Sequence, residues 1–378
     1  MLKTATLTWN SFYNYGTCLQ AYALQRYILS IGYENSIIDD STIITGGEVH
    51  NSIKKQSKWR QRWTKLWQSF HSNYRAFYKY QRVLCPAVNG FKSTCLKIDY
   101  NIESVLNDTS VYDVYICGSD QIWNPTALVD SRRKFYYADF SKKKISYAPS
   151  IGISFIPDEW KDKVKELLSS FTAISIREEA GRKVLQEMYQ QKVELVVDPT
   201  LLLSKEEWSK VLPAKKRKEN YVLGYILTPY QQFYKTARDY AHQHGLKFYL
   251  FMLNLEDYGQ ADRLISGGPF DFLRYVYDAE VVFTDSYHGT IFSTIFERPF
   301  YTFKRFSDDS PINQNSRIET LLGFMGAQDR LIDRNNAEIP DDSIPDFIDI
   351  KARMQPLIEH SKDFLKTNLS AIEKSLNK

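Results

Sequence analysis

The sequence predicts an α/β fold built from two doubly wound parallel units. Residues 2–9, 18–32 and 36–39 are predicted as a strand, a helix and a strand, the βαβ unit of a parallel sheet. A second series of this kind begins at Tyr221, after the basic run 215–218. The predicted strands end in a polar residue followed by a turn, as doubly wound sheets require. A length of 378 residues also fits two domains better than one.

The first unit continues with strands that carry polar residues to their carboxyl ends. Strands are expected at 112–117, 144–149, 173–176 and 194–197, and helices at 157–170 and 181–189. The first of these strands enters the loop GSDQIWNP, which we interpret as a binding loop because loops at strand ends carry sites. Asp120 in this loop either binds a ligand or caps a helix. Arg177 either binds a ligand or pairs with Glu178, and Asp198-Pro199 is interpreted as a turn before the second unit.

The second unit is organised around the segment from Ala279 to Phe303. It reads as a buried strand, a polar turn, a helix that opens near His288 and a further strand. The first amides of a helix lack intrahelical partners and its dipole favours anions, so this turn predicts an anion site. His288 at its mouth can supply a proton near neutral pH, or it serves as a structural hydrogen-bonding group. Earlier strands are expected at 221–227 and 246–252, and helices at 230–244 and 271–277.

These patterns divide the chain into three parts. We expect an N-terminal Rossmann-like domain at 1–204, a C-terminal Rossmann-like domain at 205–345 and terminal helices at 346–378. The NYGT loop after the first strand lies at the carboxyl end of the predicted sheet, where ligands bind in open α/β folds.

Composition restricts the class of protein. A formal charge of +4 does not by itself indicate nucleic-acid binding. The four cysteines form no CxxC pair and have no histidine at metal spacing, which is typical of a reducing compartment and predicts no metal site. The N-terminus lacks a signal-peptide pattern, and no apolar run reaches the roughly 18 residues of a membrane span. We therefore expect a cytoplasmic protein, either soluble or peripheral on the inner face of the membrane.

The segment at about 50–98 differs from the rest of the chain. Residues 49–98 contain no Asp or Glu, and nine Lys or Arg lie between Lys54 and Arg82. Trp59, Trp63 and Trp67 recur at helical spacing within this insertion. A basic helix with an aromatic face suits docking on an anionic membrane. The alternative is an inserted helix that packs its aromatic residues on the domain. One basic helix without a known reader fold is weak support for nucleic acid.

Several motifs together resemble the polysaccharide pyruvyl transferase family. They occur in one order and cover most of the chain: NYGTCLQAYALQ (14–25), YDVYICGSDQIWNP (112–125), ISIREEAG (174–181), VVDPTLLLSKEEW (196–208), AEVVFTDSYHGTIFSTIFERPF (279–300) and the weaker SRIETLL (316–322). The resemblance implies two Rossmann-like domains facing a cleft, as in GT-B glycosyltransferases. It also implies transfer of the enolpyruvyl group of phosphoenolpyruvate to a sugar, which forms a pyruvate ketal, releases phosphate and needs no cofactor.

The resemblance also suggests roles for individual residues. Family members carry Arg two positions before the histidine, where this chain has Ser286, so another cation must hold the donor; Arg305 is one candidate. The expected assignments are His288 as general acid; Asp120 as base or sugar-binding group; Arg177, Ser286, Gly289, Thr290, Lys304 and Arg317 for phosphoenolpyruvate; and Asn14, Tyr15, Ser119, Gln121, Trp123 and Asn124 for the acceptor.

The partners follow from this chemistry. We expect phosphoenolpyruvate, a lipid-linked sugar acceptor and, through Trp59, Trp63 and Trp67, an anionic membrane surface. The acceptor is expected on the N-terminal domain and the donor on the C-terminal domain. Two alternatives remain: a GT-B glycosyltransferase that uses a nucleotide sugar, and a non-catalytic relative in polysaccharide assembly.

Overall fold

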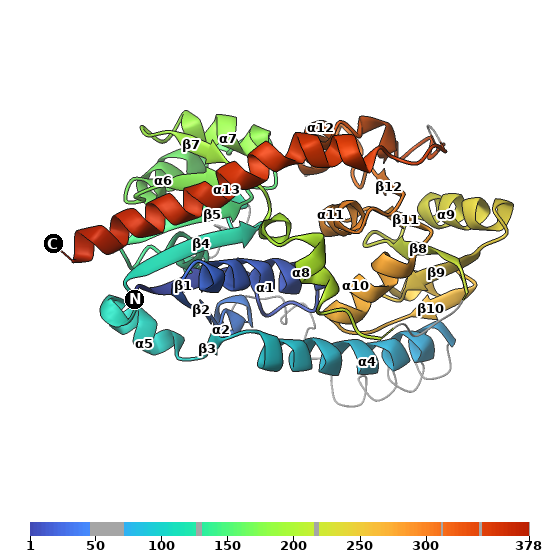
Figure 1. The fold of residues 1–378 in the computed structure, drawn as a ribbon, viewed down its shortest axis with the longest axis horizontal. Helices are drawn as coiled ribbons and strands as arrows, with labels where there is room; N and C mark the ends of the chain where they lie inside the picture. The colour runs from blue at the N-terminus through green and yellow to red at the C-terminus, as the bar shows by residue number, and fades with distance from the viewer. Residues whose placement is uncertain (46–71, 126–130, 215–218, 311–312, 340–341, 378) are drawn as a thin grey trace.

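The computed structural model describes residues 1–45, 72–125, 131–214, 219–310, 313–339 and 342–377. Figure 1 shows two α/β units side by side, each with a parallel sheet and flanking helices. The two parallel sheets confirm the α/β class predicted from the sequence. Trp59, Trp63 and Trp67 lie outside the described residues, so docking through them remains a prediction.

The first sheet has the strand order β3-β2-β1-β4-β5, and its paired strands are all parallel. Its strands are β1 (Lys3–Leu7), β2 (Glu34–Ile38), β3 (Ile98–Asp99), β4 (Val114–Asp120) and β5 (Lys144–Pro149). A parallel pair, β6 (Ile174–Ile176) and β7 (Val193–Leu195), adjoins β5 through the bridge between Ile145 and Ala173. The apolar residues of β1 and β4 are buried, because helices cover both faces of a parallel sheet.

The second sheet has the strand order β10-β9-β8-β11-β12-β13 and is also parallel. Its strands are β8 (Tyr221–Tyr225), β9 (Lys247–Phe251), β10 (Arg263–Ile265), β11 (Val281–Thr284), β12 (Phe300–Phe303) and β13 (Leu331–Ile332). The strands of the first unit end at Leu195 and those of the second begin at Tyr221, so the change of sheet falls around the expected boundary at 204/205.

Helices connect the strands of both units. In the first unit they are α1 (Tyr15–Ser30), α2 (Ser41–Thr45), α4 (Ser72–Cys95), α5 (Ile102–Asn107), α6 (Asp158–Leu168), α7 (Glu179–Gln186) and α8 (Lys205–Ser209). In the second unit they are α9 (Gln231–Gln243), α10 (Pro269–Asp278), α11 (Tyr287–Ile295), α12 (Ser316–Met325) and α13 (Phe347–Leu376). Short 3-10 turns lie between them: η1 (Thr109–Val111), η3 (Ser131–Tyr137), η4 (Pro199–Leu202), η5 (Leu255–Asp257) and η6 (Gln328–Arg330).

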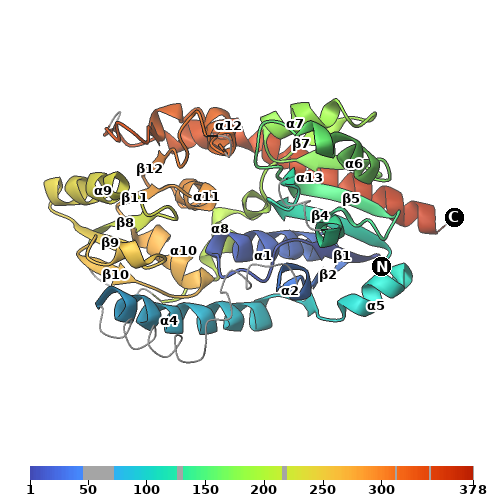
Figure 2. The ribbon, with the colours of Figure 1, turned by 180° about the vertical axis from the view of Figure 1, so that it is seen from behind.

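Two long helices connect the units along opposite edges of the molecule. Figures 1 and 2 show α4 along one edge and α13 along the other. In α4, the Tyr80 hydroxyl donates to the Leu264 carbonyl at 2.9 Å beside the second sheet. In α13, the Ser361 hydroxyl accepts from the backbone N–H of Val197 at 2.8 Å in the first unit. Tyr80 thus attaches the described part of the insertion to the second sheet, whereas Tyr78 of the same helix is 51% exposed.

The core continues across the junction of the two units. Trp208 of α8 is fully buried, and its ring lies 5.7 Å from that of Tyr22 and 5.1 Å from that of Phe292. These rings come from α1 in the first unit and α11 in the second. Aromatic pairs at such distances add packing energy beyond the area that they bury. The helix that carries His288 is therefore fixed against both sheets.

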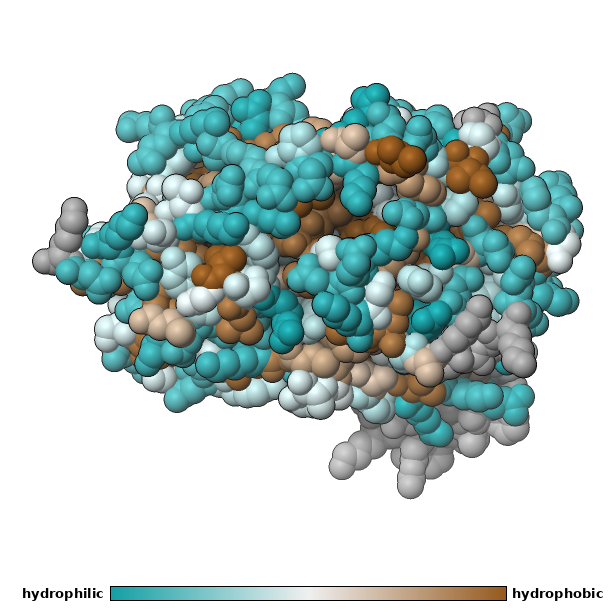
Figure 3. All heavy atoms as spheres, viewed as in Figure 1, coloured by the Kyte–Doolittle hydropathy of each residue, from teal (hydrophilic) through white to brown (hydrophobic). Residues whose placement is uncertain are grey.

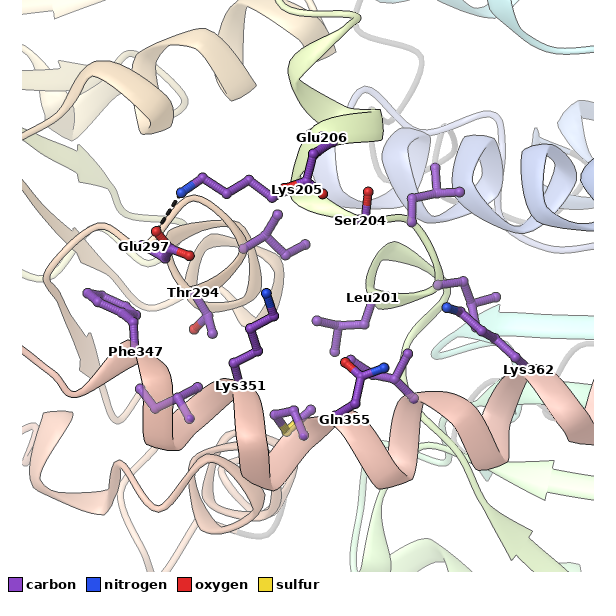
Figure 4. Close-up of a pocket in the computed structure, with 16 residues that line it drawn as sticks. Leu201, Ser204, Lys205, Glu206, Thr294, Glu297, Phe347, Lys351, Gln355 and Lys362 are labelled. Atoms are coloured by element: carbon purple, nitrogen blue, oxygen red, sulfur yellow. Dashed lines mark hydrogen bonds and ion pairs between the residues drawn. The ribbon is translucent and has the colours of Figure 1, made fainter.

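A mostly aliphatic cavity of about 230 Å³ lies beside α13. Figure 4 shows Lys351 and Gln355 of α13 near it, and Lys205 reaching Glu297 at 2.5 Å across its edge. Figure 3 shows apolar side chains at the centre of this face, with hydrophilic ones around them. Leucine, isoleucine and methionine side chains such as Leu201 and Met354 line this cavity together with charged residues, among them Glu206 and Lys351.

Candidate functional site

A polar cavity of about 200 Å³ lies where strands of both sheets end. Its walls come from the loops that follow β1, β4, β6, β8, β11 and β12, and from the start of α12. In open α/β sheets, ligands bind beyond the carboxyl ends of the strands. The charged or titratable groups that line it are Asp120, Arg177, Asp285, Tyr287, His288, Arg305 and Arg317.

His288 stands in the first turn of α11, against the backbone of α1. Ser286 is the N-cap of this helix, and its side chain accepts from the Gly289 amide at 3.3 Å. A Cβ atom at Gly16 would lie 2.2 Å from His288 Nδ1, so only glycine allows the two helices to approach this closely. His288 is 6% exposed, and its buried Nε2 forms no hydrogen bond with the described residues. A buried ring nitrogen without a partner is available to a ligand.

Arg177 forms the centre of a buried ionic cluster. Nη1 donates to Asp198 Oδ2 at 2.7 Å and Nη2 donates to Asp120 Oδ1 at 3.3 Å. The guanidinium also lies 4.5 Å from the centre of the Tyr287 ring. Burial opposes its charge, but Asp120 and Asp198 outweigh burial and raise the pKa of Arg177 above its ordinary value. Arg177 is therefore a permanent buried cation, and its ion-pair partners are Asp120 and Asp198 rather than Glu178.

Asp198 connects Arg177 with His288. Its Oδ2 lies 3.4 Å from His288 Nε2, the geometry of an ion pair when the ring is protonated, and it accepts from the Ser119 hydroxyl at 3.3 Å. Burial favours the neutral carboxyl, but His288 and Arg177 outweigh burial and hold the pKa of Asp198 below its usual range. Asp198 does start the turn η4 by accepting from the Thr200 amide at 3.0 Å. Interpreting it only as a turn residue missed this second role.

Asp120 ends β4 in a left-handed conformation, with φ of 64°. Its Oδ2 accepts from the Thr17 hydroxyl at 2.9 Å, and its Oδ1 accepts from the Gln121 amide at 2.9 Å. Asp120 thus joins β4 to α1 and pairs with Arg177 rather than capping a helix. Burial raises the pKa of this carboxyl, but Arg177 and His288 outweigh it and the pKa of Asp120 lies below its ordinary value. A carboxylate of this kind is a good hydrogen-bond acceptor and a weak base.

Two further arginines enter from the second unit. Arg305 pairs with Asp285 at 3.2 Å. Arg317 is 8% exposed and, within the described part of the chain, forms no ion pair; its Nη2 donates to the Gln314 amide oxygen at 2.9 Å. Burial, together with repulsion from Arg177 and Arg305, lowers the pKa of Arg317 to about 10, so the group is still charged at neutral pH. A buried cation without a carboxylate partner indicates a site for an anion.

The structure brings several expected residues to the cavity or its supporting shell. Asn14, Asp120, Gln121, Arg177, Ser286, His288 and Arg317 line it. Ser119 lies behind it on Asp198, and Gln121 donates to Gln314 across the two units at 2.9 Å.

Other expected residues lie elsewhere. Trp123 is fully buried in the core, where its ring stacks on Tyr137 at 4.9 Å, so it cannot stack on a sugar. Lys304 faces Asp308 and Glu319, and Arg305 lines the cavity in its place. Asn124, Gly289 and Thr290 support their loops and lie outside the lining, and the Thr290 hydroxyl is hydrogen-bonded to that of Thr302 at 2.8 Å. Tyr15 is buried at the junction of the units.

Sequence reasoning missed some residues of the lining. Trp9, Asp285 and Gln314 all line the cavity. Trp9 is the last residue of the strand predicted at 2–9, and Asp285 lies in the polar turn predicted after the strand at 281–283, so the rule that ligands bind at strand ends could have found both. Gln314 belongs to the polar stretch after β12, where no periodic pattern marks individual residues.

The described residues give two further limits. Histidines, cysteines and carboxylates do not gather in groups of three or more suited to a metal ion in this part of the chain. Among the described residues, no helix is both long enough and apolar enough to cross a bilayer.

The fold and the cavity define an α/β protein with a polar cavity, lined by three arginines and a buried histidine, between two parallel sheets. The model of the family described as polysaccharide pyruvyl transferase matches residues 14–305. Because this match extends over most of the chain, the protein belongs to the polysaccharide pyruvyl transferase family. A search of curated proteins gave no match.

Solved structures with a similar arrangement include UDP-GlcNAc 2-epimerases and an alpha-glucosyltransferase. UDP-GlcNAc 2-epimerase from Neisseria meningitidis, bound to UDP-GlcNAc, gives a TM-score of 0.46 at 9% identity, covering 98% of this chain and 100% of that chain. The enzyme from Methanocaldococcus jannaschii, with UDP-GlcNAc and UDP, gives 0.44 at 13% identity, covering 94% and 99%. An alpha-glucosyltransferase with UDP and a 13-mer DNA gives 0.45 at 10% identity, covering 98% and 94%.

Replacement of Asp198 by Asn tests the ionic cluster. The variant leaves Arg177 with one carboxylate, so we expect the free energy of unfolding at neutral pH to fall by about 3–5 kcal/mol. Because the folded state lowers the pKa of Asp198, its contribution to wild-type stability is complete above the unfolded-state pKa of about 3.9 and is lost as the pH falls further. The difference between the two proteins in urea denaturation should therefore narrow below about pH 4.

Asp349→Asn is the matched control, because Asp349 forms an exposed ion pair with Arg353 at 2.6 Å. It should change the free energy of unfolding by no more than about 0.5 kcal/mol. An equally small effect of Asp198→Asn at neutral pH would contradict the cluster.

Proposed function

We propose that the protein transfers the enolpyruvyl group of phosphoenolpyruvate to a sugar and forms a pyruvate ketal. The observation that carries this proposal is the group of three guanidiniums, from Arg177, Arg305 and Arg317, around one cavity that also contains His288. Phosphoenolpyruvate carries a phosphate and a carboxylate, both of which suit the planar donors of arginine. Arg317 has no carboxylate partner among the described residues, and such an anion would supply one.

The reaction requires proton transfer to carbon and loss of phosphate. C3 of phosphoenolpyruvate gains a proton, and C2 develops oxocarbenium character. One sugar hydroxyl adds to C2, phosphate leaves, and a second hydroxyl closes the ketal ring. Of the two hydroxyl protons, one balances the proton added to C3 and the other leaves with phosphate. The chain must therefore provide an acid near C3 and cations around the departing phosphate.

His288 is our assignment for the acid. Its buried Nε2 forms no hydrogen bond within the described residues and lies 3.4 Å from Asp198 Oδ2. Arg317 and Arg305 would hold the phosphate together with the first amides of α11, which have no intrahelical acceptor. Arg177 would face the donor carboxylate. Ser286 already accepts from the Gly289 amide, so it shapes the helix start and contributes little charge.

The acceptor would enter from the side of the first unit. Asn14, Gln121 and Asp120 line the cavity there and offer amide and carboxylate groups to sugar hydroxyls. Because the pKa of Asp120 is lowered, Asp120 acts as a hydrogen-bond acceptor that orients the hydroxyl rather than as a strong base. We extend the proposal to a lipid-linked acceptor, which the basic aromatic segment around Trp59, Trp63 and Trp67 would present from an anionic membrane.

The first prediction concerns the acid. His288→Ala should lower kcat for phosphate release by about 10²- to 10⁴-fold and leave the thermal stabilisation by phosphoenolpyruvate in place. His242→Ala is the matched control. His242 lies on α9, is half-exposed and pairs with Asp262 at 3.0 Å. Turnover is measured as phosphate release with a panel of aryl and lipid-linked hexosides and a mass readout on the sugar. Near wild-type turnover of the variant would show that another group is the acid.

The second prediction concerns the donor site. Phosphoenolpyruvate should raise the Tm of the wild type, since saturation at about 100 times Kd stabilises a protein by about 2.7 kcal/mol. Arg317→Ala should weaken this binding roughly 10- to 100-fold, the cost of losing a charge-assisted hydrogen bond. Arg353→Ala, at an exposed pair on α13, should leave the shift intact. A Tm shift with UDP-GlcNAc and none with phosphoenolpyruvate would favour the glycosyltransferase alternative.

The third prediction concerns the membrane. Replacing Trp59, Trp63 and Trp67 together by Ala should reduce co-flotation with vesicles of phosphatidylcholine and phosphatidylserine, because interfacial aromatic rings supply the apolar part of docking. Turnover of a water-soluble aryl glycoside should be unchanged. Equal flotation of the wild type and the variant would remove the membrane from the proposal and leave the chemistry untouched.

A further inference from the structure

A second cavity, of about 360 Å³, adjoins the one that holds His288. The two cavities share Asn14 and Leu227 as wall residues, so they lie on either side of the same two side chains. α4 closes one side of the second cavity with Phe77 and Gln81, and the loop after β9 closes the opposite side. Its volume lies within the range of about 300–1,000 Å³ that is usual for small-molecule pockets.

The two cavities differ sharply in charge. Among its described lining residues, the second cavity has no carboxylate and no basic side chain, whereas the first has three arginines. The polar groups of the second cavity are amides and phenols, among them Asn14, Gln81 and Asn254. A neutral, hydroxyl-rich ligand suits such a lining, because amides both donate and accept hydrogen bonds and need no countercharge.

Aromatic rings and three leucine side chains form the remaining walls. Tyr13 at the rim is 47% exposed, and Phe77 faces the cavity from α4. Rings of this kind pack against the C–H faces of a sugar, a contact that combines apolar burial with a fixed orientation. Together with the amides they give the mixed lining that a hexose requires, with a few placed polar groups on an otherwise apolar surface.

The floor is rigid and connects to the reaction site. The Tyr15 hydroxyl donates to the Gly267 carbonyl at 3.1 Å, and its ring stacks on Phe272 at 5.1 Å. Tyr225 is buried beside it. Burial raises the pKa of the Tyr225 phenol and the nearby Asp285 carboxylate raises it further, so the phenol stays neutral. Ser286 is among the groups that interact with this phenol, so the floor of the second cavity reaches the start of the helix that carries His288.

We propose that this uncharged cavity, lined from α4 and the NYGT loop, binds the neutral sugar unit next to the one that receives the pyruvyl group. The proposal rests on the proposed function, because that function requires a saccharide acceptor near His288. A glycan that places one unit by His288 extends its neighbouring unit past Asn14. Asn14 uses its oxygen to cap α1 at Thr17, at 3.1 Å, and its NH₂ group is left for the glycan. Tyr15, expected at the acceptor from the sequence, belongs to this second subsite.

The test compares mono- and disaccharide acceptors. The probes are aryl glycosides of common hexoses and N-acetylhexosamines, each as the single sugar and as its disaccharide. Wild type should show a lower KM for a disaccharide than for the matching monosaccharide. Gln81→Ala should raise the KM for the disaccharide about three- to tenfold, the usual effect of one lost hydrogen bond, with kcat and the monosaccharide KM unchanged. Val83→Ala, on an exposed position of α4, is the control.

Each outcome separates this proposal from the proposed function. Turnover with equal KM values for both acceptor types, unaffected by Gln81→Ala, would overturn the second subsite and leave the pyruvyl transfer standing. If no sugar is turned over, saturation-transfer NMR with the aryl disaccharides tests whether the second subsite binds a saccharide. Disaccharide signals that Gln81→Ala weakens and Val83→Ala preserves would support the subsite. Absent signals, or signals that Gln81→Ala leaves unchanged, would overturn it.

Discussion

The buried contact of Arg177 with Asp198 and Asp120 is the constraint on which the site depends. A buried ion pair costs desolvation energy that its attraction repays only with good geometry, so packing alone does not explain this cluster. Arg177 follows β6, Asp198 follows β7 and Asp120 ends β4. Asp198 also lies within ion-pair distance of His288 of α11. One guanidinium thereby fixes the relative positions of β4 of the first sheet, the neighbouring β6–β7 pair and, through Asp198, a helix of the second unit. Fixed charges of this kind are what a polar reaction site needs, because they do not reorganise during the reaction.

The sequence predicted the fold where periodicity is strong and failed where elements are short. The βαβ order located α1, α9, β8, β9 and the segment from β11 to β12 within a few residues. The edge strands β3, β10 and β13 have two or three residues each, too few to show a period. Helix α4 runs from Ser72 to Cys95 through Pro86, because tertiary packing of Leu84, Val88 and Phe91 overrides the local penalty of proline.

The site was predictable in part, for a similar reason. The rule that ligands bind at strand ends identified Asp120, Arg177 and His288 without any long-range information. The sequence predicted Asp198 only as a turn residue, because Asp-Pro-Thr is also a turn signature. A sequence does not show that one carboxylate can both start a turn and pair with Arg177. Trp123 was misplaced because a Trp in a polar loop looks exposed, although this ring is stacked in the core. The close approach of Gly16 to His288 joins residues far apart in the chain, so no local pattern reveals it.

This chain has Ser286 where other family members carry an arginine. The countercharge for the proposed donor therefore comes from other residues. Ser286 caps α11 with its own oxygen, a task for which arginine has no acceptor. The positive charge comes instead from Arg305 and Arg317 of the second unit, which face Arg177 of the first across the cavity. Burial, followed by repulsion from Arg177 and Arg305, lowers the pKa of Arg317, so gathering these three cations in one cavity carries an electrostatic cost. A bound dianion would relieve that cost in both units at once. In the proposed function, the phosphate and carboxylate of phosphoenolpyruvate contact guanidiniums of both units, which gives a physical reason for the proposed donor site to lie between the units rather than within one.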